Sequence, residues 1–110
     1  METKYELIVC IINAGFSQNV AKAARDAGAR GGTVIKGRGT ANPEAEEFFN
    51  ISIQPNKEVV LILVTSDIKD AVMRAIYKDS GLATDGKGIA FSLPVTRTAF
   101  SFADNGEDAA

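Results

Sequence analysis

The feature that most constrains the fold is an uninterrupted apolar run, residues 59–64 (Val-Val-Leu-Ile-Leu-Val). The run is too short to span a bilayer, and its composition is typical of a strand that is buried on both faces. A second run of the same kind covers residues 7–12 and ends at Asn13-Ala14-Gly15, which favours a turn. These two runs predict two strands of one sheet, and residues 7–12 are predicted to form a central strand.

Each run is followed by a segment whose apolar residues recur at three- and four-residue spacing, as in an amphipathic helix. The first helix is predicted over residues 18–27, with Ser17 as its N-cap and Gly28 as its end. The second helix is predicted over residues 68–80, with Thr65-Ser66-Asp67 capping its start. The first helix is rich in alanine, so we expect it to pack closely on a sheet.

Shorter extended segments complete the predicted order of elements. Residues 33–35 form a short strand, which the glycine-rich residues 37–43 are not expected to continue. Residues 48–53 alternate and resume an extended conformation, which Pro55-Asn56 then interrupts. Residues 89–95 form the last strand. The predicted order is therefore strand, helix, strand, strand, helix, strand.

This order is the α+β, ferredoxin-like βαββαβ arrangement, in which two right-handed crossovers build one antiparallel sheet. Both helices then cover the same face of the sheet. The strands are apolar on both faces, so we expect the bare face to contact another subunit. Residues 1–102 are predicted to form a single domain, followed by an acidic, flexible tail at residues 103–110.

The composition excludes several classes of site. The chain has 12 basic and 14 acidic residues and a net charge of −2, which argues against a nucleic-acid binder. It has no histidine, which excludes histidine-based catalysis and histidine-bearing metal sites. The single cysteine, Cys10, lies in an apolar run and is interpreted as a buried thiol, not a nucleophile. The first residues lack a secretion signal, so we expect a cytoplasmic protein. From the composition we expect neither a bound metal nor a catalytic residue.

Two segments combine glycine with positive charge and are candidates for binding phosphate. The first is residues 29–40, which include Arg38, and the second is residues 84–88 (Thr-Asp-Gly-Lys-Gly). Glycine lets backbone amides approach phosphate oxygens, and lysine or arginine supplies the charge. Lys57 is a candidate for a third cation. Neither segment has Walker A spacing, and each taken alone is also compatible with a plain turn.

The chain resembles the P-II family of nitrogen- and carbon-regulatory proteins, over about residues 4–107. The resemblance rests on Gly31-Gly32-Thr33-Val34 after the first helix and on Asp85-Gly86-Lys87, where that family has its phosphate-binding B-loop. Pro55 with Lys57, and Val95-Thr96-Arg97, also match. The family implies a homotrimer that holds an adenine nucleotide (ADP, AMP or ATP) between its subunits and acts in signal transduction without catalysing a reaction.

The resemblance also implies which residues bind the nucleotide. The strand after the first helix would contact adenine and ribose, and the B-loop would hold the phosphates. The implied nucleotide-binding residues are Gly31, Thr33, Gly37, Arg38, Lys57, Val64, Asp85, Gly86, Lys87 and Gly88. Residues 37–50 correspond to the family's T-loop, an arm that would dock on a target protein such as an enzyme or a membrane transporter.

The chain departs from the family pattern in ways that change the expected ligand. Residues 37–50 contain no tyrosine, so uridylylation is not expected there, and no glutamine that would contact 2-oxoglutarate is identifiable. Phe100 and Phe102 stand where the family has two arginines that hold the outer phosphates. Because each lost charge-assisted contact is worth about 1.5–3 kcal/mol, we expect ADP or AMP to compete well with ATP.

Three other functions share this fold and stay open at this stage. An acylphosphatase-like hydrolase would need an arginine-bearing loop after the first strand, which Asn13-Ala14-Gly15 does not offer. A CutA-like trimer that binds transition metals is disfavoured by the absence of histidine. A purely structural trimer, in which the glycines serve only as turns, requires no ligand at all.

Overall fold

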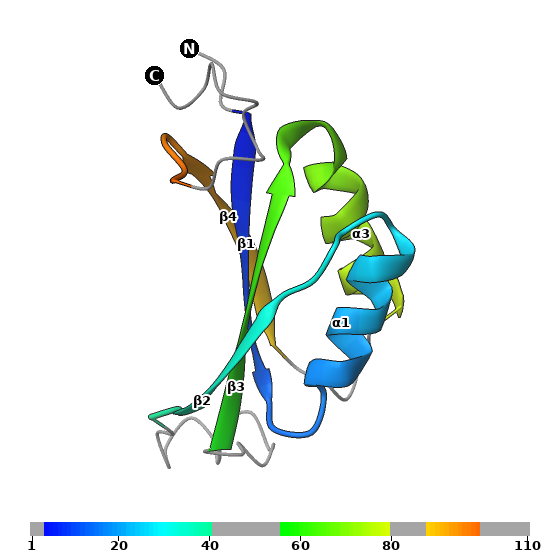
Figure 1. The fold of residues 1–110 in the computed structure, drawn as a ribbon. Helices are drawn as coiled ribbons and strands as arrows, with labels where there is room; N and C mark the ends of the chain where they lie inside the picture. Colours follow the sequence, from blue (N-terminus) through cyan, green and yellow to red (C-terminus); the bar gives the residue numbers. More distant parts are fainter. Residues whose placement is uncertain (1–3, 41–55, 80–87, 100–110) are drawn as a thin grey trace.

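The computed structural model describes residues 4–40, 56–79 and 88–99 (Figure 1). The elements are β1 (Tyr5–Asn13), α1 (Ser17–Asp26), β2 (Thr33–Arg38), β3 (Asn56–Thr65), the single 3-10 turn η1 (Ser66–Ile68), α3 (Lys69–Asp79) and β4 (Ile89–Val95). The extended segment predicted at residues 48–53 and the tail predicted at residues 103–110 lie outside the described residues.

The four strands form one sheet in the order β2-β3-β1-β4, and each neighbouring pair is antiparallel. The two apolar runs recognised in the sequence are the central strands β1 and β3, which pair from Tyr5–Thr65 to Asn13–Lys57. Since β1 to β2 and β3 to β4 are both connections across a neighbouring strand, the topology is the predicted ferredoxin-like α+β fold.

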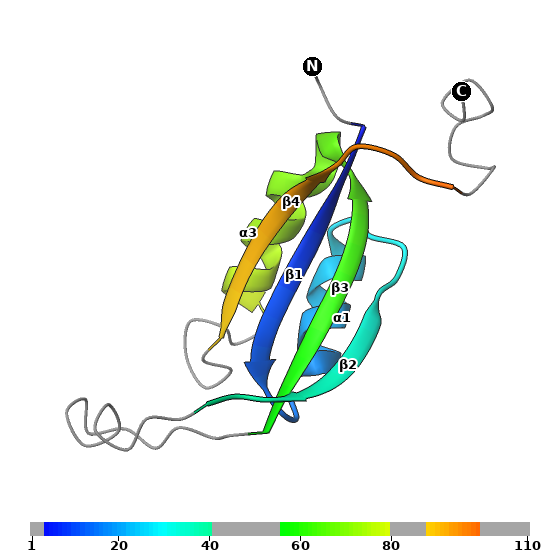
Figure 2. The same cartoon turned by 90° about the vertical axis from the view of Figure 1, so that its left-hand side faces the viewer.

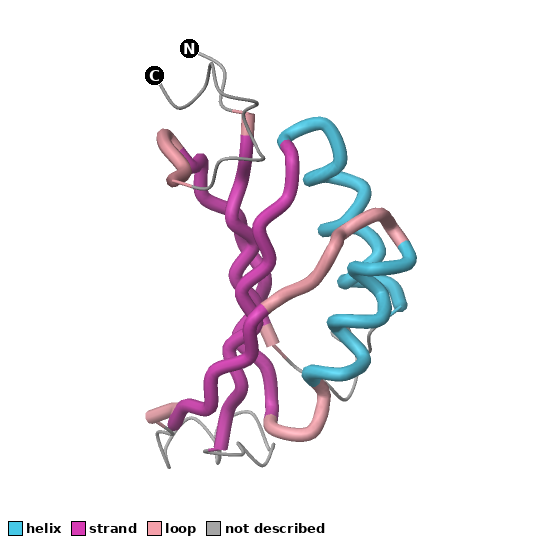
Figure 3. The backbone as a smooth tube through the Cα atoms, viewed as in Figure 1, coloured by secondary structure: helices cyan, strands magenta, loops and turns pink. Residues whose placement is uncertain are grey.

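Both helices lie on one face of the sheet (Figures 1 and 3). The core lies between them and the central strands. Alternate residues of β1 and β3 point into this layer, and helices α1 and α3 add further apolar side chains. The fully buried side chains are Ile8, Ile12, Ile62, Ile76, Val20, Val60, Val72 and Cys10. Burial raises the pKa of the Cys10 thiol from 9.0 to about 11, so the interpretation of Cys10 as a buried thiol is confirmed.

Neither described helix lies on the opposite face of the sheet (Figure 2), and apolar side chains are exposed there. Edge strand β4 exposes Ile89, Phe91 and Leu93, which are 59%, 39% and 48% exposed, and Ile35 of β2 is 47% exposed. These side chains alternate with the helix-facing ones, as the strand periodicity requires. The prediction that both faces are apolar is confirmed, and its cover by another subunit stays a prediction. We call this surface the bare face.

Three local predictions were wrong. Phe16, not Ser17, occupies the N-cap position of α1, and its side chain makes no capping hydrogen bond. Strand β2 does not stop at Ile35 but continues to Arg38, because residues 36–38 pair with residues 56–58 of β3. The second helix begins one residue later than expected, at Lys69, because residues 66–68 form the 3-10 turn η1.

Within the described residues, neither helix is long and apolar enough to cross a membrane. Cysteine, aspartate and glutamate side chains do not gather there in groups of three that could hold a metal ion.

Candidate functional site

The candidate site is built on the open edge of β3. The β2–β3 ladder begins at the pair Thr33–Leu61, so the last residues of β3 have β1 as their only described neighbour strand. The Ser66 amide donates to the carbonyl oxygen of Lys4 at 2.8 Å. By the alternation of an antiparallel ladder, the even-numbered residues of β3 therefore turn their backbone amides and carbonyls toward β1. Leu63 and Thr65 therefore turn theirs toward the open edge.

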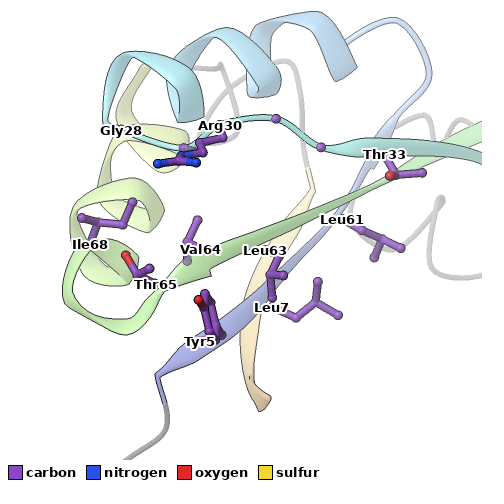
Figure 4. Close-up of a pocket in the computed structure, with 13 residues that line it drawn as sticks. Tyr5, Leu7, Gly28, Arg30, Thr33, Leu61, Leu63, Val64, Thr65 and Ile68 are labelled. Atoms are coloured by element: carbon purple, nitrogen blue, oxygen red, sulfur yellow. The ribbon is translucent and has the colours of Figure 1, made fainter. Parts of the chain in front are cut away.

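A hollow of about 600 Å³ lies along this edge (Figure 4). It wraps around β3, so that residues of the bare face and residues near the ends of α1 and η1 both contribute. The lining residues are Tyr5, Leu7, Gly28, Ala29, Arg30, Gly31, Gly32, Thr33, Leu61, Leu63, Val64, Thr65 and Ile68. Arg30 is the only charged residue among them, and Thr33 and Thr65 bring hydroxyl groups. The volume is in the range of small-molecule sites.

Residues 28–32 form the outer wall of the hollow, and two glycines shape it. Gly28 ends α1 with φ +114°, a conformation that favours glycine, while its amide donates to the Arg25 carbonyl oxygen at 3.0 Å. Gly32 passes close to β3: a Cβ there would lie 3.0 Å from the Leu61 carbonyl oxygen. A Cβ at Gly31 would meet nothing within 4 Å. The wall therefore favours glycine at residue 28 through its backbone conformation and at residue 32 through close packing, whereas Gly31 has space beside it.

The structure brings together three residues that the sequence predicted for the adenine side of the site. Gly31, Thr33 and Val64 all line the hollow, although Val64 is 31 positions from Thr33 in the chain. Gly37, Arg38 and Lys57 do not line it. Gly37 pairs with Lys57 and Arg38 with Asn56, at the far end of the same ladder.

The residues predicted to hold phosphate are only partly described. Asp85, Gly86 and Lys87 lie outside the described residues. The Lys57 ammonium donates to the Asn13 side-chain oxygen at 2.7 Å, and it forms no ion pair with another residue that the structure describes. Gly88 packs on β1: a Cβ there would overlap the Ile11 carbonyl oxygen and lie 2.7 Å from Ile12 Cγ2. Close packing is thus sufficient reason for glycine at residue 88.

The sequence analysis missed several residues of the hollow. Tyr5, Leu7, Leu61, Leu63 and Thr65 reach it because they share the odd-numbered, bare-face side of paired strands. The period of two was visible in the sequence, but the early end of the β2–β3 ladder was not. Arg30 precedes Gly31 directly and was inside a segment already selected for its charge.

A carboxylate fills the loop between β1 and α1. The backbone amides of Gly15 and Ser17 both donate to Oε1 of Glu58, at 3.1 and 3.2 Å. Glu58 thus provides the hydrogen-bond acceptor at the start of α1, a role that Ser17 was predicted to have. Its negative charge is also favourable at a helix N-terminus. Because Glu58 occupies these amides, they are not open to a phosphate, which argues further against the acylphosphatase-like alternative.

Comparisons with known proteins support the fold. No protein-family model matches the sequence, and no curated protein sequence matches it. The structure is similar to that of Arabidopsis thaliana PII bound to citrate, with TM-score 0.68 and 24% identity, over 90% of this chain and 82% of that one. It is also similar to a functionally unknown protein from Pediococcus pentosaceus, with TM-score 0.64 and 15% identity, over 90% and 99% of the two chains. The chain therefore has a PII-like, ferredoxin-like fold.

Proposed function

We propose that this protein is a small-molecule-sensing regulator without catalytic activity. It binds an adenine nucleotide at the edge of β3 and controls a partner enzyme or transporter through residues 37–50. The observation that carries the proposal is that Gly31, Thr33 and Val64 line one hollow of about 600 Å³. The PII-like fold supports a signalling role, and the Arabidopsis thaliana neighbour contains citrate, a small organic anion.

The chemistry of the hollow suits a purine base. Leu61 and Leu63 supply apolar surface for the faces of the ring, and the Thr33 hydroxyl supplies a donor or acceptor for its edge. The backbone groups of Leu63 and Thr65 turn toward the same opening and offer an amide and carbonyl for each residue. Such a mixed edge matches the donor and acceptor pattern of adenine.

The phosphates require the other candidate residues, which lie farther along the sheet. From Thr33 to Gly37 is four residues, or about 13 Å along an antiparallel strand. We propose that a second and a third copy of the chain cover the bare face and bring the residues of different subunits together. The exposed Ile35, Ile89, Phe91 and Leu93 support this assembly, since large apolar side chains exposed on one face of a sheet are typical of a contact with another subunit.

The main test is the unfolding temperature with and without millimolar ATP, ADP, AMP and cyclic AMP. A ligand at 100 times its Kd stabilises the folded state by about 2.7 kcal/mol. We expect Thr33→Val and Lys87→Ala to reduce the response, and the exposed Thr96→Val to retain it as a matched control. A response to none of these nucleotides would favour the purely structural trimer instead.

The nucleotide preference and the assembly need separate measurements. Calorimetric titration is expected to give ADP or AMP an affinity comparable with that of ATP, and a hundredfold advantage of ATP with magnesium would contradict this. Sedimentation equilibrium is expected to give three times the mass of the 11.6 kDa chain. A monomer that nevertheless binds nucleotide would remove the inter-subunit part of the proposal and leave the hollow itself.

A further inference from the structure

A second hollow lies on the helix side of the sheet, between α1 and β2. It has a volume of about 310 Å³, and the site described above does not use it. Its apolar surface comes from Ala21 and Ala24 of α1 and from Val34, Val60 and Ile62 of the sheet. We call it the α1–β2 groove.

Val34 shows that the groove is open. It points to the helix side of β2, because it pairs with the buried Val60, yet it is 44% exposed. The neighbouring Val60 and Ile62 are 1% exposed and form the floor. α1 therefore covers the central strands and leaves the edge strand β2 uncovered on its own side. A small apolar group fits this space in contact with α1 and the sheet together.

The polar residues at the groove have one sign of charge. Arg25 at the end of α1 and Arg30 before β2 line it together with Gln18, and none of the lining residues is acidic. Within the described residues, neither guanidinium forms an ion pair. Guanidinium groups match carboxylates in geometry and bind them through paired hydrogen bonds. The groove thus offers an apolar floor with a cationic rim.

We propose that the α1–β2 groove binds a small monocarboxylate with an apolar body, whose carboxylate meets Arg25 and Arg30. A polyphosphate is a poor match, because the floor has no polar side chain for it. Residues 29–32 line both the groove and the hollow on β3, so the two sites share this segment. A ligand in the groove holds residues 29–32 from the helix side of the sheet and so changes the affinity of the hollow for its nucleotide.

The test uses hexanoate as the probe and hexan-1-ol as its uncharged counterpart. In amide-resolved NMR titrations of the full chain, hexanoate is expected to shift Ala21, Ala24 and Val34 saturably, and Phe91 of the bare face little. Hexan-1-ol is expected to bind about tenfold more weakly, because it lacks the charge-assisted contact. Equal binding of the alcohol, or the absence of saturable shifts at millimolar hexanoate, overturns the proposal.

Variants separate this groove from the nucleotide hollow. Arg25 lines only the groove, so Arg25→Gln is expected to weaken hexanoate about tenfold and to leave the nucleotide response unchanged. Arg74 on α3 is exposed and lines neither hollow, so Arg74→Gln is the matched control. Ala21→Leu fills the groove from the solvent side and is expected to abolish hexanoate binding in a folded protein. Unchanged hexanoate affinity in Arg25→Gln and Ala21→Leu overturns the proposal, whatever the nucleotide does.

Discussion

The adjacent glycines 31 and 32 offer a sharp test of the wall that bounds the candidate site. Neither has a positive φ, so alanine is compatible with the backbone at both positions. A Cβ at Gly31 enters open space, whereas a Cβ at Gly32 lies 3.0 Å from the Leu61 carbonyl oxygen and 3.1 Å from Ile62 Cγ1. Both neighbours belong to β3, which is paired on its other side to β1 and has little freedom to move away.

The expected free energies follow from this difference. Gly31→Ala stabilises the protein by roughly 0.4–1 kcal/mol, because alanine reduces the entropy of the unfolded chain. Gly32→Ala gains the same term but suffers overpacking worth about 1–3 kcal/mol, so we expect a net destabilisation of about 1 kcal/mol. The gap between the variants is then about 2 kcal/mol, or roughly 8 °C in unfolding temperature for a domain of this size.

The assay is equilibrium unfolding in urea at one fixed protein concentration, supported by calorimetric unfolding temperatures. Fixed concentration matters because association of subunits would shift apparent stability. If Gly32→Ala proves as stable as Gly31→Ala, the close approach of residues 29–32 to β3 is refuted. The wall of both hollows would then have to lie farther from the sheet.

Three other substitutions test neighbouring features. Glu58→Gln keeps an oxygen acceptor for the amides of Gly15 and Ser17 but loses the charge. We expect the free energy of unfolding in urea to fall by about 1 kcal/mol, and high salt to reduce this difference. A difference that does not depend on salt would contradict the role of charge at the start of α1. Burial raises the pKa of the Cys10 thiol to about 11, so its contribution to stability is present below pH 9 and is lost as the pH rises to 11. We expect the free energy of unfolding to fall by about 2–3 kcal/mol over this range in the wild type, and this fall to be missing in Cys10→Ala. Equal dependence of the unfolding free energy on pH in both proteins would refute this. Gly88→Ala forces a Cβ against the backbone of β1, so we expect about 3 kcal/mol of destabilisation without any ligand, and near-wild-type unfolding would show that the glycine serves another purpose.

The strands and helices were predictable because their signals are local. The apolar runs of β1 and β3 and the alternation of β4 each lie within one element, and the antiparallel topology followed from their order. Gly28 could be recognised as the end of α1 because a positive φ after a helix favours glycine. The meeting of Gly31 and Thr33 with Val64 was anticipated from a family resemblance, since strand pairing brings residue 64 beside the first crossover.

The errors came from contacts between residues distant in sequence. Glu58 accepts hydrogen bonds at the start of α1 from 41 positions away, a contact that the sequence does not show, so Ser17 was predicted as the N-cap. Pairing with β3 carries β2 through Gly37 to Arg38, although glycine is a poor strand former. For Gly88, whose role in phosphate binding stays a prediction, nothing in the sequence shows that its Cα also lies against β1. Sequence alone could not separate a glycine required by packing from one required by a ligand.

The unequal covering of the two faces of the sheet has a consequence for how this protein behaves on dilution. The helices cover the apolar side chains on one face of β1, β3 and β4, whereas Ile89, Phe91, Leu93 and Leu63 on the other face are left exposed by the described residues. If other copies of the chain cover this face, association stabilises the folded state, and the unfolding midpoint rises with protein concentration. Substitutions on the bare face would then act on solubility and half-life well before they act on any ligand.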